Sequence, residues 1–272
     1  MSWNAYPAPE LLPPVPEKII PQERSTAHET PTLLEAVAFF TLAGILLLAI
    51  QGLGAAIVLH WHVFGKIGLK KLVYETRFTI PMMLVSYGAV LVAAAALFRR
   101  VWLVPFLDGI HWNFGQVQRY WPWLVGIGIG LGFGIQLASN FLPVPKELPV
   151  DAFFRTSLDA WMVALFGILI APIAEEIAFR GFLYPSLRRW TGRVVAAVLT
   201  SIPFALLHGQ QVAHAWGPLA MVFLVSIMLC AVRERTGSVA ASALVHACYN
   251  LSIFVVIFYA SGGFMHLERL KD

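Results

Sequence analysis

The sequence predicts an all-α protein, a polytopic bundle of about seven (six to eight) transmembrane helices. Three observations carry this prediction. Apolar residues make up 58% of the 272 residues, charged residues make up only 12%, and the apolar residues gather in long stretches. Charged residues form about 25% of an average soluble protein, so this chain has too few of them to cover a surface in water. The whole chain is therefore neither a soluble enzyme nor a nucleic-acid-binding protein.

Residues 1–32 form a first segment that differs from the rest of the chain. They are rich in proline and contain no long apolar stretch. They also lack the basic start and apolar centre of a signal peptide, so we expect no cleavage. The composition predicts a disordered N-terminal tail.

Seven apolar stretches follow, and most are long enough to span about 30 Å of hydrocarbon at about 1.5 Å per residue. The fifth is short and contains Pro203, so we expect it to cross only in part or to pair with the connector at 188–193. Lys and Arg clusters lie between the stretches, and Trp and Tyr residues flank them, as is typical of membrane interfaces. The stretches run roughly over residues 34–59, 78–98, 121–138, 160–184, 194–207, 216–232 and 239–260.

The net charge and the cysteines refine this class. The charge is +4, with a pI near 9.2, which indicates a membrane-flanking excess of Lys and Arg rather than a DNA-binding surface. Cys230 and Cys248 both lie inside apolar stretches and predict neither a disulfide framework nor a zinc ribbon.

We expect an integral, multi-pass protein, located in the plasma (inner) membrane if the cell is bacterial. The distribution of Lys and Arg slightly favours a cytoplasmic N-terminus.

The third stretch is rich in glycine. Its GIGIGLGFG segment does not fit a nucleotide-binding fingerprint, because no GxGxxG register and no preceding strand are present. Gly126, Gly130 and Gly134 repeat every four residues, a spacing that lets two helices approach closely in lipid. We therefore expect these three glycines to form a helix-packing face.

The fourth stretch contains three charged residues, Glu175, Glu176 and Arg180. An ionisable group at this depth costs at least about 2.5–3.5 kcal/mol on insertion scales, so such groups face a cavity or each other. Glu176 and Arg180 are i,i+4 neighbours that can form an ion pair, whereas Glu175 points about 100° away from Glu176. The alternative is a helix that ends near residue 174, with the charges in the interface. The apolar residues at 177–179 and 182–183 favour the buried arrangement.

Further polar residues lie in the fifth and seventh stretches. Phe204 and His208 are i,i+4 neighbours on one helix, and His246 and Asn250 are i,i+4 neighbours on another. Counted at about 1.5 Å per residue, Glu175, both histidines and the asparagine fall within about two turns of each other in depth. A lone buried histidine is usually structural, but this convergence favours an active site.

Three motifs carry a resemblance to a known family. EEIAFR at 175–180, FALLH at 204–208 and HACYN at 246–250 fit EExxxR, FxxxH and HxxxN, in that order on successive helices. Together they resemble the CPBP family of type II CAAX prenyl endopeptidases and bacteriocin-processing or self-immunity proteases, often labelled Abi. The resemblance covers about residues 160–260. With the composition and the apolar stretches, it predicts a tail (1–32), N-terminal transmembrane helices (33–155), a catalytic core (156–262) and a short C-terminal tail (263–272).

The resemblance implies an intramembrane glutamic-type endopeptidase that needs no cofactor. Glu175 would be the general base, and His208 would orient the water. His246 and Asn250 would donate hydrogen bonds to the oxyanion of the tetrahedral intermediate. Glu176, Arg180 and Phe204 would support these four residues. The implied substrate is a membrane-embedded or lipidated peptide, and a prenylated CAAX-type C-terminus, a leader peptide and other membrane-bound precursors are all open. The other expected partner is the lipid bilayer, and no nucleic acid is expected.

Three other functions use the same residue types. A zinc protease would use Glu and His ligands, although HExxH is absent and no two histidines share an i,i+4 face. A transporter or proton relay also uses carboxylates and histidines inside the membrane, but the halves of the chain show no internal repeat. A non-catalytic scaffold could keep the fold and bind partner proteins.

Overall fold

The structure is a computed structural model that describes residues 31–143, 145 and 148–270. All but the last two residues of the predicted N-terminal tail lie outside the described residues. Every regular element among the described residues is a helix, and none of them is a strand. The elements in chain order are α1 (Leu33–His60), α2 (Leu69–Leu72), α3 (Thr76–Trp102), α4 (Phe106–Gly109), α5 (Phe114–Ser139), η1 (Pro149–Phe153), α6 (Ser157–Leu165), η2 (Phe166–Ile170), α7 (Ala171–Glu176), η3 (Ile177–Leu183), α8 (Tyr184–Leu207), α9 (Trp216–Thr236), α10 (Val239–Ala260) and η4 (Leu267–Leu270). Segments η1 and η4 are 3₁₀ helices, whereas η2 and η3 are π-helical.

Six helices within the described part of the chain are long and apolar enough to cross a membrane. One of them, Ser157–Leu207, has 51 residues, far more than the roughly 20 that a bilayer needs. It is interrupted at Gly192, whose φ of 76° lies in the region that only glycine adopts without strain. The Phe179 and Phe204 rings meet at 5.0 Å between centroids, so the two arms run back along each other. The fourth and fifth predicted stretches are these two arms, and the fold is the predicted polytopic helical bundle.

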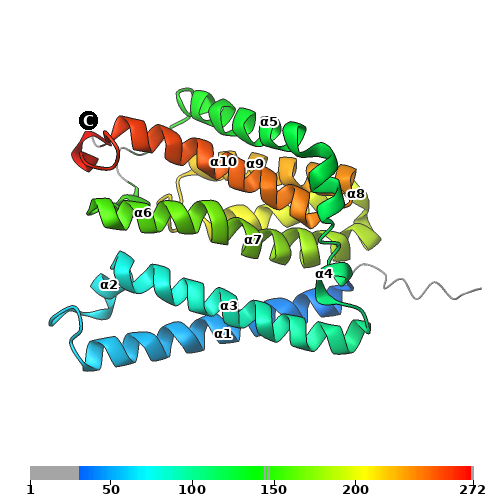
Figure 1. Cartoon of the computed structure of the whole chain (residues 1–272), viewed down its shortest axis with the longest axis horizontal. Helices are drawn as coiled ribbons and strands as arrows, with labels where there is room; N and C mark the ends of the chain where they lie inside the picture. Colours follow the sequence, from blue (N-terminus) through cyan, green and yellow to red (C-terminus); the bar gives the residue numbers. More distant parts are fainter. Residues whose placement is uncertain (1–30, 144, 146–147, 271–272) are drawn as a thin grey trace, which may run out of the picture.

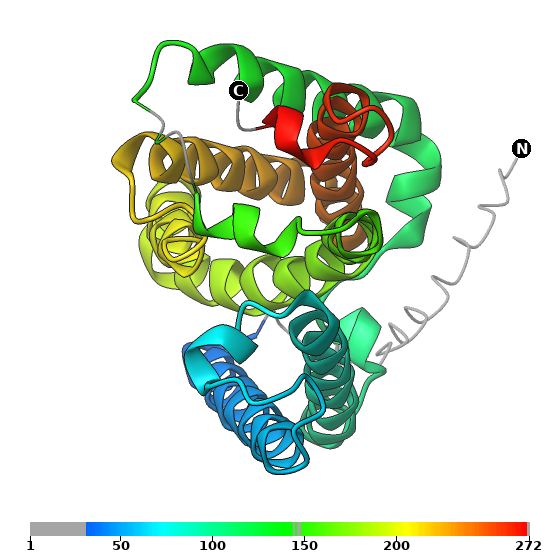
Figure 2. The ribbon, with the colours of Figure 1, turned by 90° about the vertical axis from the view of Figure 1, so that its left-hand side faces the viewer.

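The helices form two groups (Figure 1). The pair α1 and α3 packs along its length and lies beside the later helices α5 to α10. The end view in Figure 2 shows this pair below a ring of the later helices. Aromatic residues join the two groups: the Phe39 ring stacks on the Phe182 ring at 4.2 Å, and Phe98 and Trp102 pack on the same ring.

The glycine prediction was wrong in its register. Gly126, Gly130 and Gly134 have no neighbouring atom within 4 Å of where a Cβ would lie, so they form no packing face. The alternate glycines make the contact instead. A Cβ on Gly128 would lie 2.5 Å from the Cys248 Cβ and 2.6 Å from the Val245 carbonyl, both on α10. The reason is that α10, against which α5 packs most extensively, lies on the opposite side of α5 from the predicted face.

This register predicts different outcomes for two identical substitutions. Gly128→Ala is expected to destabilise the protein by about 1–3 kcal/mol, because the Val245 carbonyl belongs to a helix backbone and cannot rotate away. Gly130→Ala introduces the same methyl group into open space and is expected to be neutral or slightly stabilising. Thermal unfolding of both variants in the same detergent measures the difference. Equal melting temperatures would contradict the packing register.

Candidate active site

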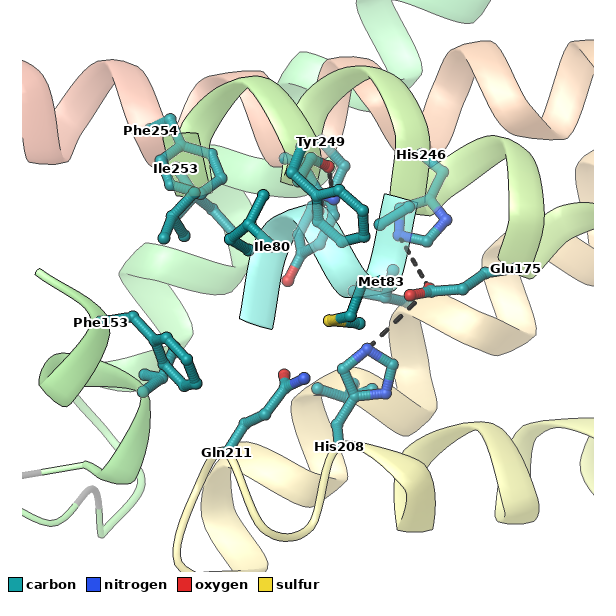
Figure 3. A pocket seen from close by; sticks show the side chains of 18 of the residues that line it. Ile80, Met83, Phe153, Glu175, His208, Gln211, His246, Tyr249, Ile253 and Phe254 are labelled. Atoms are coloured by element: carbon teal, nitrogen blue, oxygen red, sulfur yellow. Dashed lines mark hydrogen bonds and ion pairs between the residues drawn. The ribbon is translucent and has the colours of Figure 1, made fainter. Parts of the chain in front are cut away.

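A cavity of about 290 Å³ lies between the later helices and α3. All four residues predicted to be catalytic line it: Glu175, His208, His246 and Asn250. Figure 3 shows the Glu175 carboxylate between the two histidine rings, with Gln211 and Phe153 farther along the cavity. These last two residues belong to the loop after α8 and to η1. The cavity therefore runs from the partly exposed Glu175 carboxylate toward the loops at one end of the bundle.

The helix that carries Glu175 departs from α geometry on both sides of the two glutamates. The π-helical segments η2 and η3 flank α7, and Pro172 at the start of α7 has no N–H to donate. π-turns free backbone carbonyls from the α-helical pattern, and here side chains from other helices bond to them. Asn250 Nδ2 donates to the Gly167 carbonyl at 2.7 Å, and Arg233 Nε donates to the Arg180 carbonyl at 3.3 Å.

Glu175 lies symmetrically between the two histidines. Its Oε2 atom is 3.9 Å from His208 Nε2 and 3.9 Å from His246 Nε2. These distances are too long for direct hydrogen bonds, but they are the separation that one bridging water molecule spans. The Glu175 and His208 side chains are each 22% exposed, so water reaches them. The arrangement can hold a water molecule in contact with a carboxylate and an imidazole.

The orientation of His208 is set by its own helix. The Nδ1–H group donates to the Phe204 carbonyl at 2.8 Å, because a carbonyl oxygen can only accept. In the neutral ring the remaining nitrogen, Nε2, then carries the lone pair and faces Glu175. The Nε2 atom of His208 can therefore accept a hydrogen bond from a water molecule at the carboxylate.

Glu176 and Arg180 form the predicted ion pair, with 2.8 Å between Arg180 Nη1 and Glu176 Oε1 and no exposure of either side chain. Arg180 Nη2 also donates to the Ser226 hydroxyl and carbonyl on α9, at 2.7 and 2.8 Å. A second contact of Glu176 was not predicted: His246 Nδ1–H donates to its Oε1 atom at 3.0 Å. Glu176 thus orients the His246 ring so that Nε2 points toward Glu175.

Phe204 lies at the centre of these supporting contacts. The Arg180 guanidinium carbon lies 4.7 Å from the centre of its ring, which is a cation–π geometry. The ring also packs 4.9 Å from the His208 ring and 5.9 Å from the His246 ring. Phe204 is almost fully buried, so it holds both imidazoles in place by packing.

Asn250 reaches the cavity from α10 and has a firmly held amide. One N–H of its amide donates to the Gly167 carbonyl, and the NH₂ group has a second N–H. That second donor is available to a group bound in the cavity. His246 Nε2 can also donate, but only in the imidazolium form, in which both ring nitrogens carry hydrogen.

The contribution of Asn250 gives a testable expectation. Asn250→Ala is expected to lower kcat about 10²- to 10³-fold with little change in KM, because an oxyanion donor acts in the transition state. Ser252→Ala on the same helix is the control, since Ser252 does not line the cavity. A peptide-cleavage assay with the two purified variants measures the effect, and an unchanged kcat in Asn250→Ala would rule out the donor role.

Several residues that line the cavity were not predicted from the sequence. Tyr87 and Met83 come from α3, where they are two members of a long apolar stretch and carry no distinguishing signal. Gln211 lies in the GQQ segment after His208, where its polarity in a short loop could have drawn attention. His214, in the same loop, is not among the residues that line the cavity.

The zinc alternative depends on how the His, Cys, Asp and Glu side chains are spaced. Catalytic zinc sites use three protein ligands of the His, Glu, Asp or Cys types. Among residues 31–143, 145 and 148–270, no group of three such side chains is spaced to hold a metal ion. The two buried cysteines, Cys230 and Cys248, are both unpaired thiols in different parts of the bundle.

Comparisons with known proteins give three matches. The family model described as type II CAAX prenyl endopeptidase Rce1-like matches residues 157–252. An uncharacterized 24.3 kDa protein of Escherichia coli is 30% identical over 169 residues, which cover 59% of this chain and 74% of that protein. The UPF0177 protein YbdI of Lactococcus lactis is 25% identical over 193 residues, which cover 67% of this chain and 93% of that protein. No solved structure matches the chain.

Proposed function

The chain belongs to the Rce1-like family of type II CAAX prenyl endopeptidases, and on this premise we propose that it is an intramembrane glutamic-type endopeptidase. The family and the six apolar helices make it a multi-pass membrane protein and a hydrolase of the protease class. The proposed substrate is a membrane-associated peptide, and both a prenylated CAAX-type C-terminus and a leader peptide are compatible with the site.

One observation carries the glutamic mechanism. The Glu175 carboxylate lies 3.9 Å from the Nε2 atoms of both histidines, within reach of a single water molecule held among the three groups. In the proposed reaction Glu175 takes a proton from this water while His208 Nε2 accepts a hydrogen bond from it. The water oxygen then bonds to the carbonyl carbon of the scissile peptide.

The later steps, stabilisation of the intermediate and release of the products, involve Asn250, His246 and Glu175. Asn250 and protonated His246 donate hydrogen bonds to the oxyanion of the tetrahedral intermediate. Glu175 returns its proton to the leaving nitrogen as the C–N bond breaks, which restores the carboxylate and releases a carboxylate product and an amine product. Glu176, Arg180 and Phe204 act by holding His246 and His208 rather than by touching the substrate.

The direct test is cleavage of a membrane peptide by the purified protein. The protein, reconstituted in liposomes, is expected to release two fragments whose masses add to the substrate plus one water. In H₂¹⁸O the new C-terminus is expected to gain one ¹⁸O. Comparing CAAX-type, farnesylated and leader-type peptides then defines the substrate. Absence of cleavage with every class, in a folded preparation, would contradict the proposal.

A chelator separates this mechanism from a zinc mechanism. We expect full activity after treatment with 1,10-phenanthroline, because no set of three ligand side chains in the described ranges is spaced for a metal ion. The measurement is the cleavage rate before and after chelation and after addition of zinc. Loss of activity that zinc restores would instead assign Glu175 and the histidines to a metal site.

A further inference from the structure

A second cavity lies beside the same carboxylate. It has a volume of about 240 Å³ and lies between α1, α3, the α7–η3 segment and the end of α8. Glu175 and Tyr87 line both this cavity and the first one. The two cavities therefore share a wall that includes the proposed general base and Tyr87.

The linings of the two cavities differ in chemistry. The first contains His208, Gln211 and Asn250. The second is apolar apart from Glu175 and the Tyr87 hydroxyl. Its remaining walls come from one face of α1, which includes Phe40, Gly44 and Leu47, and from apolar residues of α3, the α7–η3 segment and Leu207 opposite that face. Water is therefore favoured in the first cavity and an apolar group in the second.

We propose that the second cavity is a specificity pocket for one large apolar side chain next to the scissile bond. The proposal rests on the proposed protease function. Glu175 forms part of the wall of both cavities, and the proposed reaction requires a substrate peptide at its carboxylate, which brings the peptide beside this pocket. A peptide whose carbonyl group lies at Glu175 then places a neighbouring side chain in the apolar space.

The volume limits the size of this side chain. At about 30 Å³ per water-sized group, 240 Å³ holds roughly eight heavy atoms. A Phe side chain comes closest to filling this space, and the smaller side chains of Leu and Met also fit. Leu207, the last residue of α8, lines the pocket and is 68% exposed, so the pocket borders the surface of the protein at this residue.

Gly44 is the residue that keeps the pocket open. A Cβ at this position meets no atom within 4 Å, so a larger side chain fits the helix and fills the space instead of clashing. Gly52 lies on the same helix, also has no neighbour within 4 Å and does not line the pocket. The two glycines are a matched pair: a side chain introduced at Gly44 enters the pocket, whereas one introduced at Gly52 lies outside it.

The test compares Gly44→Leu with Gly52→Leu in reconstituted protein. The substrates are two sets of three peptides. In each set one of the two residues that flank the mapped cleavage site is Ala, Leu or Phe, and the other residue is unchanged. We expect the unmodified protein to favour Phe over Ala at one of these positions by about 10-fold or more in kcat/KM. In Gly44→Leu this Phe-to-Ala ratio is expected to fall close to 1, in Gly44→Ala to an intermediate value, and in Gly52→Leu to remain unchanged.

The possible outcomes distinguish failure of the specificity pocket from failure of the proposed protease function. If no peptide is cleaved by the unmodified protein, the protease function fails. If peptides are cleaved but Gly44→Leu changes the rates of Ala and Phe peptides by the same factor, the pocket holds a lipid chain or has only a packing role, and the specificity proposal is overturned. A Phe-to-Ala ratio near 1 in the unmodified protein also overturns it. Gly44→Ala provides the same comparison if Gly44→Leu does not fold.

Discussion

Replacing Glu175 by glutamine is expected to lower kcat for peptide cleavage by about 10²- to 10⁴-fold, the contribution of a well-placed general base. The amide has nearly the same shape as the carboxylate but cannot take a proton from water. The 3.9 Å distances to His208 and His246 should persist, so binding of the substrate, and therefore KM, is expected to change little. Cleavage rates of purified protein in liposomes, with thermal unfolding measured in parallel, give the result.

A second glutamate provides the control for this experiment. Glu234 accepts hydrogen bonds from Tyr184 and Arg188 and does not line either cavity. Glu234→Gln is expected to leave kcat within about twofold of the unmodified protein, since it lies outside the site. Full activity in Glu175→Gln would remove Glu175 from the role of general base and would direct attention to His208.

Replacing Arg180 by methionine is expected to give the largest loss of stability. The substitution leaves the Glu176 carboxylate buried without its cation, and breaking a buried ion pair in this way costs about 3–5 kcal/mol. It also removes the bonds to Ser226 that connect η3 to α9. We expect a large fall in melting temperature, measured by thermal unfolding in detergent, together with a loss of folded protein in the membrane.

Arg188 makes the control, because it also pairs with a glutamate, in this case Glu234 on α9, but at an exposed position. Its side chain is 50% exposed and lies 2.7 Å from Glu234. Exposed ion pairs contribute about 0–1 kcal/mol, so Arg188→Met is expected to change the melting temperature only slightly. The double variant Arg180→Met with Glu176→Gln should recover part of the lost stability, because no charge then remains unpaired. Similar losses in Arg180→Met and Arg188→Met would show that burial does not determine the strength of the pair.

The sequence predicted the membrane class and the order of the helices well. A segment that crosses lipid must be apolar over about 20 residues, whichever helices it later packs against. Low charge and long apolar stretches therefore indicate the membrane class without knowledge of the tertiary structure. The sequence predicted two separate stretches at 160–184 and 194–207, and the backbone reverses between them at Gly192.

The glycines of α5 show that repeat spacing does not identify the face of a helix that packs. A helix with glycine at every second position presents small residues on more than one face. The four-residue repeat is present both at 126, 130 and 134 and at 128 and 132. Only the position of α10 decides that Gly128 and Gly132 make the contact. Repeat spacing therefore predicted that close packing would occur but not which side of the helix would do it.

The sequence by itself determined the relations that lie within one helix. The Glu176–Arg180 pair, the alignment of Phe204 with His208 and that of His246 with Asn250 follow from 3.6 residues per turn. The requirement that three charges inside an apolar stretch find partners follows from the cost of burying charge in lipid. Only the tertiary structure decided the relations between helices, including the bond from His246 to Glu176, the equal distances from Glu175 to the two histidines and the second cavity beside Glu175. These depend on how far each helix is rotated and shifted against its neighbours, and such rotations are set by packing contacts between residues far apart in the chain.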